Sequence, residues 1–222
     1  MELLHFFIDF ILHINDHLDA MVIQYGVMIY VILFLIIFVE TGLVVMPFLP
    51  GDSLLFAAGA ICARTAGNPD AVLQLWPLLG LLFIAAVLGD NTNYAIGRFL
   101  GHRAIALKVR GRALVKQAHI DKTHAFFERY GTKAIIMARF VPIVRTFTPF
   151  VAGVGRMGYR GKFLPFDIAG GALWIGSMTL AGYFLGAIPW VHRNFEAVVL
   201  AIIVISVMPM VIGYFKAKSQ AA

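Results

Sequence analysis

The chain has 222 residues, of which 60% are hydrophobic and 14% charged, and its mean hydropathy is +0.85. This composition excludes a soluble globular domain and indicates an integral membrane protein. Residues 1–97 have a net charge of −7 and residues 98–222 a net charge of +13. Because the cations lie between apolar segments, they favour contact with anionic lipid headgroups over nucleic acid binding.

The apolar pattern predicts helices from the first residues onward. Residues 1–20 alternate apolar blocks with acids, which predicts a short amphipathic helix at the membrane surface. A membrane span needs roughly 20 residues. Uncharged runs of about that length occur at 20–39, 71–89, 168–191 and 197–215. The sequence therefore predicts an all-α integral membrane protein with a single domain over residues 1–222.

Two further apolar stretches, at about 40–63 and 134–155, are interrupted by prolines. Pro47 and Pro50 divide the first, and Pro142 and Pro149 divide the second. Each arm has about a dozen residues or fewer and covers at most roughly half of the hydrocarbon core. We expect both stretches to be re-entrant hairpins, and the alternative is a pair of proline-kinked helices. Gly182 and Gly186 predict a close contact between helices.

The basic residues predict the sidedness of these segments. The segment 98–133 carries nine of the eighteen basic residues, which indicates a cytoplasmic location. Arg156, Arg160 and Lys162 lie on the same side only if 134–155 returns to the face it entered. We count membrane crossings from this segment toward each end of the chain. The count predicts that the loop around Arg64 is outside and that both chain termini are in the cytoplasm. The two hairpins then enter from opposite faces, as in an inverted repeat.

Five ionisable residues lie within apolar segments, which marks them as candidates for function: Glu40, Asp52, Asp90, Arg139 and Arg145. The first hairpin contains only acids and the second only arginines, so we expect opposite charges to meet near the midplane. An arginine fork can bind phosphate oxygens, and a buried carboxylic acid can exchange a proton. The alternative is that Glu40–Arg145 and Asp52–Arg139 are purely structural ion pairs.

Other polar residues have simpler explanations. Asp90 precedes Asn91 and Asn93, so capping or a hydrogen bond between helices is an alternative to a role in transport. Asp167 lies near a predicted membrane boundary, and we expect it to be solvated.

Metal, cofactor and enzyme signatures are missing from the sequence. His13 and His17 share a helix face, but the glutamate of the zinc-protease pattern and a third ligand are absent. The single cysteine, Cys62, excludes an internal disulfide and a cysteine-rich cluster. No phosphate-binding loop, serine elbow or Cys/His nucleophilic pair occurs. We therefore predict no metal site, no cofactor and no ATP-driven or other enzymatic activity.

Three ordered motifs together resemble the bacterial DedA family over nearly the whole chain. They are the run from Glu40 to Ser53, Gly89-Asp90 followed by Tyr94-Ala95-Ile96-Gly97-Arg98, and the run from Arg139 to Thr146 followed by Ala152-Gly153. The resemblance implies an inner-membrane protein with two opposed re-entrant hairpins, the VTT or SNARE-associated architecture that eukaryotic lipid scramblases share. It also implies movement of undecaprenyl phosphate or phospholipid across the bilayer, linked to the proton-motive force.

The family's essential residues match Glu40 and Asp52 among the acids, and Arg139 and Arg145 among the arginines. The leading hypothesis is a lipid translocase in which the two arginines bind the phosphate and the two acids exchange protons. Asp90 and Arg98 are candidate accessory residues.

Three other classes of function stay open. A proton-coupled antiporter of small cations or drugs needs the acids but not the arginines. A lipid phosphatase needs a nucleophile and base that are not evident, and a membrane assembly factor needs no transported substrate. The sequence does not decide the lipid, the direction of movement or the oligomeric state, a homo-oligomer included.

Overall fold

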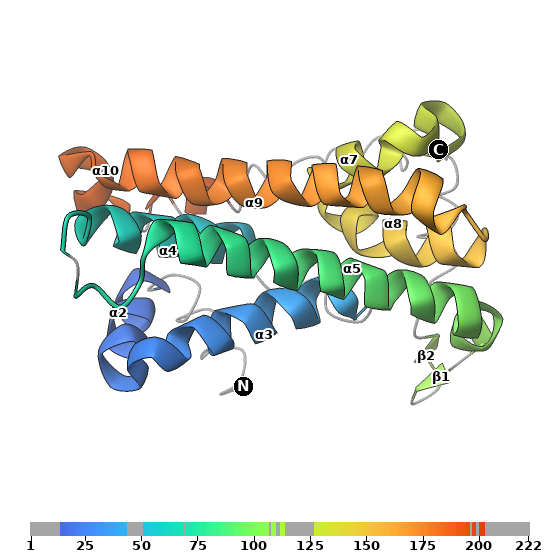
Figure 1. The fold of residues 1–222 in the computed structure, drawn as a ribbon, viewed down its shortest axis with the longest axis horizontal. Helices are drawn as coiled ribbons and strands as arrows, with labels where there is room; N and C mark the ends of the chain where they lie inside the picture. Colours follow the sequence, from blue (N-terminus) through green and yellow to red (C-terminus); the bar gives the residue numbers. More distant parts are fainter. Residues whose placement is uncertain are drawn as a thin grey trace, which may run out of the picture. The chain divides into compact units, whose positions relative to one another are not determined.

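The computed structural model describes residues 14–43, 51–68, 70–106, 108–109, 112–113, 127–195, 197–198 and 200–202. These residues are almost entirely helical (Figure 1). The elements are α2 (Ile14–Tyr25), η1 (Gly26–Met28), α3 (Ile29–Gly42), α4 (Gly51–Arg64), α5 (Leu75–Ala106), β1 (Lys108–Val109), β2 (Arg112–Ala113), η2 (Gly131–Lys133), α7 (Ala134–Ala138), α8 (Pro142–Val154), η3 (Tyr159–Phe163), α9 (Leu164–Gly186) and α10 (Pro189–Arg193). The strands β1 and β2 form one antiparallel pair.

Three helical segments are long and apolar enough to cross a membrane: His17–Gly42, Leu75–Gly101 and Tyr159–Gly186. They correspond to the predicted spans at 20–39, 71–89 and 168–191. Most of the fourth predicted span, 197–215, lies outside the described residues, and its described residues are helical. For the described part of the chain, the predicted fold class, a helical membrane protein, is therefore confirmed.

The first segment differs from the prediction at its start. Residues 1–13 lie outside the described residues, and α2 runs from Ile14 to Tyr25 through the expected boundary at Ala20. Most of the predicted surface helix at 1–20 thus lies outside the described residues, and residues 14–20 belong to α2. The bend comes instead at Gly26, whose φ of +52° is one that glycine adopts easily, and a 3-10 turn joins α2 to α3 there.

The first predicted hairpin contains parts of two separate helices. Helix α3 ends at Gly42 and α4 begins at Gly51, and residues 44–50 lie outside the described residues. Glu40 belongs to the last turn of the 14-residue α3, so this helix continues past the expected start of the hairpin at about residue 40 and ends at Gly42.

The chain folds into two compact units made of alternating segments. The first unit contains 1–36, 50–82 and 175–208, and the second contains 37–49, 83–174 and 209–222. Helices α5 and α9 are therefore each divided between the units. The expected single domain is in this way built from two interleaved parts.

In the first unit, the end of α4 and the segment that follows it lie close to α2 and the start of α3. The Gln74 backbone N–H donates a hydrogen bond to the Tyr30 hydroxyl at 2.8 Å, and Arg64 pairs with Asp19 at 2.8 Å. Groups at these distances lie on the same side of a membrane. The sequence placed the start of the first span in the cytoplasm and the Arg64 loop outside, so one of these two placements is wrong.

Helix α4 packs closely on the second half of α9 in this unit, through glycines. At three contacts a Cβ on the glycine would collide with the facing helix, so only glycine permits the approach. The contacts are Gly59 with the Thr179 carbonyl, Gly182 with the Phe56 carbonyl, and Gly186 with Ala60. The close contact expected at Gly182 and Gly186 is confirmed.

In the second unit, α7 and α8 form the second interrupted segment. The break lies at 139–141, and Pro142 begins α8, where a missing N–H costs nothing. The expected interruption at Pro149 is wrong, because α8 continues through it. A proline removes only one intrahelical hydrogen bond, which packed membrane helices tolerate. Phe127, before this segment, packs against the cluster of Phe147 and Val151.

Helix α8 packs on the second half of α5 through the same kind of contact. A Cβ on any of three glycines would again collide with the facing helix. The contacts are Gly153 with the Tyr94 carbonyl, Gly97 with the Phe150 carbonyl, and Gly101 with Val154. The spacing within each helix is identical to that in the α4–α9 pair, so one packing arrangement occurs twice in the chain.

Candidate functional site

The second unit contains a buried cluster of ion pairs in which every member comes from a different segment. Two arginines stand at its centre, Arg139 in the turn after α7 and Arg145 in α8. The carboxylates come from α3, α5 and α9, and they are Glu40, Asp90 and Asp167. The exposed fraction of each of these three acids is 3% or less. The cost of burying them is therefore met by contact with the arginines.

Arg139 contacts two carboxylates through the same nitrogen. Its Nη2 atom donates hydrogen bonds to Asp90 Oδ2 and, at 2.7 Å, to Asp167 Oδ1. Arg139 is 4% exposed, so water screens these contacts little. Its Nη1 atom is also buried and has no hydrogen-bond partner among the described residues.

Arg145 and Glu40 form the second contact of the cluster. Arg145 Nη2 lies 2.7 Å from Glu40 Oε1, and the two side chains are 12% and 2% exposed. The residues are 105 positions apart, so this pair joins α3 to α8. The sequence named this pair as an alternative to a transport role, and the contact is compatible with both.

Trp174 on α9 lies against both arginines. The guanidinium carbons of Arg145 and Arg139 are 4.7 Å and 5.8 Å from the centroid of its ring. The indole is fully buried. A desolvated aromatic face attracts a cation, so Trp174 holds the two positive charges side by side without neutralising them.

One face of α9 is shaped for this cluster. Asp167, Gly170, Gly171 and Trp174 recur at helical spacing. A Cβ on Gly170 would lie 3.4 Å from Arg139 Nε, and one on Gly171 would lie 3.5 Å from Nη2. An added Cβ would be in ordinary van der Waals contact at these distances, so the two glycines lie directly beside the Arg139 side chain.

Asn93 fixes the position of the helices around the cluster. Its Nδ2 atom donates to the Thr41 carbonyl of α3 at 3.1 Å and to the Thr146 carbonyl of α8 at 2.9 Å. Asn93 is fully buried, one turn beyond Asp90 on α5. Glycines bring α3 and α5 together at the same depth, because Gly42 approaches Gly89.

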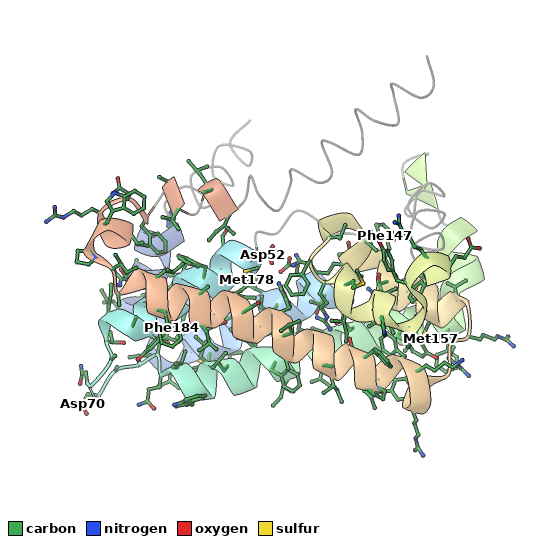
Figure 2. All side chains as sticks on the ribbon, turned by 90° about the horizontal axis from the view of Figure 1, so that it is seen from above. Asp52, Asp70, Phe147, Met157, Met178 and Phe184 are labelled. Carbon is green, nitrogen blue, oxygen red and sulfur yellow. The ribbon has the colours of Figure 1, made fainter. Side chains whose placement is uncertain are left out.

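The remaining candidates lie elsewhere. Asp52 is in the first turn of α4, within the first unit (Figure 2). Arg98 is exposed and donates a hydrogen bond at 2.9 Å to the Tyr94 hydroxyl, which itself donates to the Met157 carbonyl. Arg98 stands eight residues beyond Asp90 on α5, about 12 Å along the helix.

Sequence reasoning misjudged one member of the cluster and missed another. Asp167 was expected to be solvated, but it is 1% exposed because the Arg139 side chain covers it. Trp174 was not singled out at all. A helical spacing of Asp, two small residues and an aromatic residue on α9 was the available signal. Among the described residues, no group of three His, Cys, Asp or Glu side chains is placed to hold a metal ion.

These observations define the class of the protein. Apolar helices of membrane-spanning length and a buried charge cluster make it a polytopic α-helical membrane protein. Residues 49–184 match the family model of the VTT domain. The chain belongs to this family and, within it, to the DedA proteins.

The names of the relatives state no activity, and those of two of the three call them membrane proteins. The chain is 49% identical over 222 residues to Protein DedA of Escherichia coli, covering all of this chain and 98% of the relative. It is 47% identical to Uncharacterized membrane protein Rv0364 of Mycobacterium tuberculosis, covering 81% and 75% of the two chains. Inner membrane protein YghB of Salmonella typhimurium is 34% identical, with coverages of 92% and 86%. No solved structure matches the chain.

Proposed function

We propose that this protein moves a phosphate-bearing lipid, such as undecaprenyl phosphate or a phospholipid, across the bacterial inner membrane. Arg139 and Arg145 bind the phosphate, and Glu40 and Asp52 exchange protons with the proton-motive force. The lipid tail stays in the bilayer, so the protein shelters only the headgroup. The chain acts as a transporter and has no enzymatic activity.

The observation that carries this proposal is the position of two arginines against Trp174, of which Arg139 is buried and Arg145 is 12% exposed. Two guanidinium groups at one indole ring in an apolar interior attract anionic groups, and Glu40, Asp90 and Asp167 pair with them while no lipid is bound. The Nη1 atom of Arg139, which has no described partner, offers an N–H group for a phosphate oxygen.

We further propose that α3 with α4, and α7 with α8, form two re-entrant hairpins of an inverted repeat. The α4–α9 and α8–α5 contacts support a repeat, because the same glycines occur at the same spacing in both. The return of the chain from Tyr30 to Gln74 supports re-entry of the first hairpin. The packing of Phe127 against Val151 supports re-entry of the second.

The basic residues of 98–133 place that segment in the cytoplasm in this proposal, together with the C-terminus. The loop before α5 is then external, and Asp19 shares its side with Arg64. Helix α2 accordingly begins at the external face, in place of the cytoplasmic start expected from the sequence.

Cysteine labelling tests this topology. The native Cys62 is 3% exposed, so it gives little background with a thiol reagent. We expect Asp19→Cys and Asp70→Cys to react from outside the cell, and Lys162→Cys to react only after the inner face is opened. Labelling of Asp19→Cys and Asp70→Cys from opposite sides would contradict the hairpin.

The function itself is tested by translocation in vesicles. Purified protein is reconstituted, and movement of labelled undecaprenyl phosphate or phospholipid is followed with and without a pH gradient. We expect faster movement than in empty vesicles, and loss of activity in Arg139→Lys and Arg145→Lys, because lysine cannot form the bidentate contact. Arg64→Lys, a paired arginine outside the cluster, is the matched control.

The same variants separate the alternatives. A proton-coupled antiporter of small cations keeps its activity when the arginines become lysines. A membrane assembly factor with structural charges keeps its activity in cells when Glu40 and Arg145 are exchanged. Wild-type vesicles that move neither lipid faster than empty vesicles would refute the proposal.

A further inference from the structure

The charges around Arg139 are unequal in number. Asp90 and Asp167 contact one nitrogen of one guanidinium group, and all three side chains are at most 5% exposed. If both carboxylates are ionised, this triad carries one surplus negative charge. An uncompensated charge is costly in an apolar interior, whereas a proton shared by the two acids removes it.

The neighbouring groups leave that surplus in place. Arg145 on α8 is directed to Glu40 on α3 at 2.7 Å, so its charge has a carboxylate of its own. Asn91 on α5 approaches Asp167 Oδ2 with its Nδ2 atom at 3.4 Å and adds no charge. The described cluster therefore has three carboxylates and two guanidinium groups.

One nitrogen of Arg139 takes no part in its contacts with these acids. Its Nη1 atom is buried and has no hydrogen-bond partner among the described residues, whereas Nη2 serves both acids. A buried guanidinium N–H without an acceptor indicates that a ligand supplies one. An anionic oxygen is the acceptor that suits this group best.

We propose that Asp90 and Asp167 form a proton-binding pair, and that this pair takes up one proton when an anionic headgroup binds Arg139. The step is a transfer of one proton from water to the pair, and the proton returns to water when the anion leaves. With the proton bound, the triad has no net charge, because one carboxylate remains for one guanidinium group. Arg139 then attracts an anion more strongly than when both acids are ionised. The anion and the proton thus favour each other's binding. This inference rests on the proposed function and assigns to this pair the proton that accompanies headgroup binding, a step separate from the proton exchange proposed for Glu40 and Asp52.

A direct measurement on the wild-type protein tests the linkage. Short-chain phosphatidylglycerol is the probe, because a phosphodiester has no second ionisation near neutral pH. Trp174 reports binding by its fluorescence, in a background where the exposed Trp76 and Trp190 are replaced by phenylalanine. We expect uptake of about one proton per bound anion and a Kd that rises about tenfold per pH unit once the pair is ionised.

Variants locate the proton. In Asp167→Asn the triad has equal charges, so binding should become independent of pH and stay tight in alkaline solution. Asp90→Asn is the second variant with the same expectation, should Asp167→Asn fail to fold. Asp70→Asn, in an external loop, is the matched control and should keep the wild-type slope.

The outcomes separate this inference from the proposed function. Binding without proton uptake in the wild type would overturn the inference and leave lipid transport standing. A wild-type slope retained in both Asp90→Asn and Asp167→Asn would place the proton elsewhere and also overturn it. If phosphatidylglycerol and undecaprenyl phosphate both fail to bind wild type at any pH, the proposed function and the inference fail together.

Discussion

The two units share one packing arrangement but differ in what lies beside it. Seven residues before the close-contact glycine Gly97, α5 carries Asp90, whereas seven before Gly182, α9 carries Ile175. Four residues before the same glycines stand Asn93 and Met178. Equivalent positions are thus polar in the second unit and apolar in the first. The comparison teaches that the glycine contacts hold the helices together in both units. The residues at a few neighbouring positions decide whether a charge cluster lies beside those contacts.

Among the changes that test this difference between the units, replacing the central arginine should reduce stability most. Arg139→Leu leaves Asp90 and Asp167 buried without their cation, which we expect to cost about 3–5 kcal/mol of stability. Thermal denaturation in detergent measures the loss. Combining it with Asp90→Asn and Asp167→Asn should recover most of the stability. A single variant as stable as wild type would mean that the cluster is not buried.

The glycine contacts allow the scaffold to be tested in both units at once. In Gly97→Ala and Gly182→Ala the new methyl group meets the carbonyl of Phe150 or Phe56. We expect each to cost about 1–3 kcal/mol, because the helices must separate.

The matched controls are Gly80→Ala on α5 and Gly176→Ala on α9, where a Cβ meets nothing within 4 Å. These should be neutral or slightly stabilising, since alanine favours a helix. Should only one of the two contact glycines prove sensitive, the packing would not be equivalent in the two units.

The asparagine that joins α5 to α3 and α8 should have an effect no larger than that of the contact glycines. Asn93→Ala leaves the Thr41 and Thr146 carbonyls without that donor, at an expected cost of about 1–3 kcal/mol. Thr92→Ala is the control, since its hydroxyl bonds only to the Leu88 carbonyl of its own helix. Equal denaturation midpoints for the two variants would argue against the bridge.

The ion pair of the first unit should contribute least. Arg64 and Asp19 are 27% and 38% exposed, so water and salt screen them. Arg64→Ala should cost about 0.2–1 kcal/mol, measured by thermal denaturation at low and high salt. A loss as large as that of Arg139→Leu would show that this pair is buried in the membrane.

Much of the fold followed from the sequence, because apolar length and proline position act locally. The three long apolar helices and the break before Pro142 were predictable on these grounds. Pro149 was misjudged since a proline within a packed helix is tolerated, a fact that only tertiary contacts reveal. The site was predictable only in part. Arg139 and Arg145 are visible as charges in apolar runs, but the partner of Arg139 on α9 depends on how distant segments meet.

The interleaving of the units has a consequence for biosynthesis. Gly59 and the Thr179 carbonyl that it contacts are 120 positions apart in the chain. A ribosome-bound chain halted before Ile175 therefore exposes α4 without the helix that covers its glycine face. Insertion must keep this short helix from aggregating or slipping until the end of α9 has been translated, so maturation of the first unit is completed late although its first helices are made early.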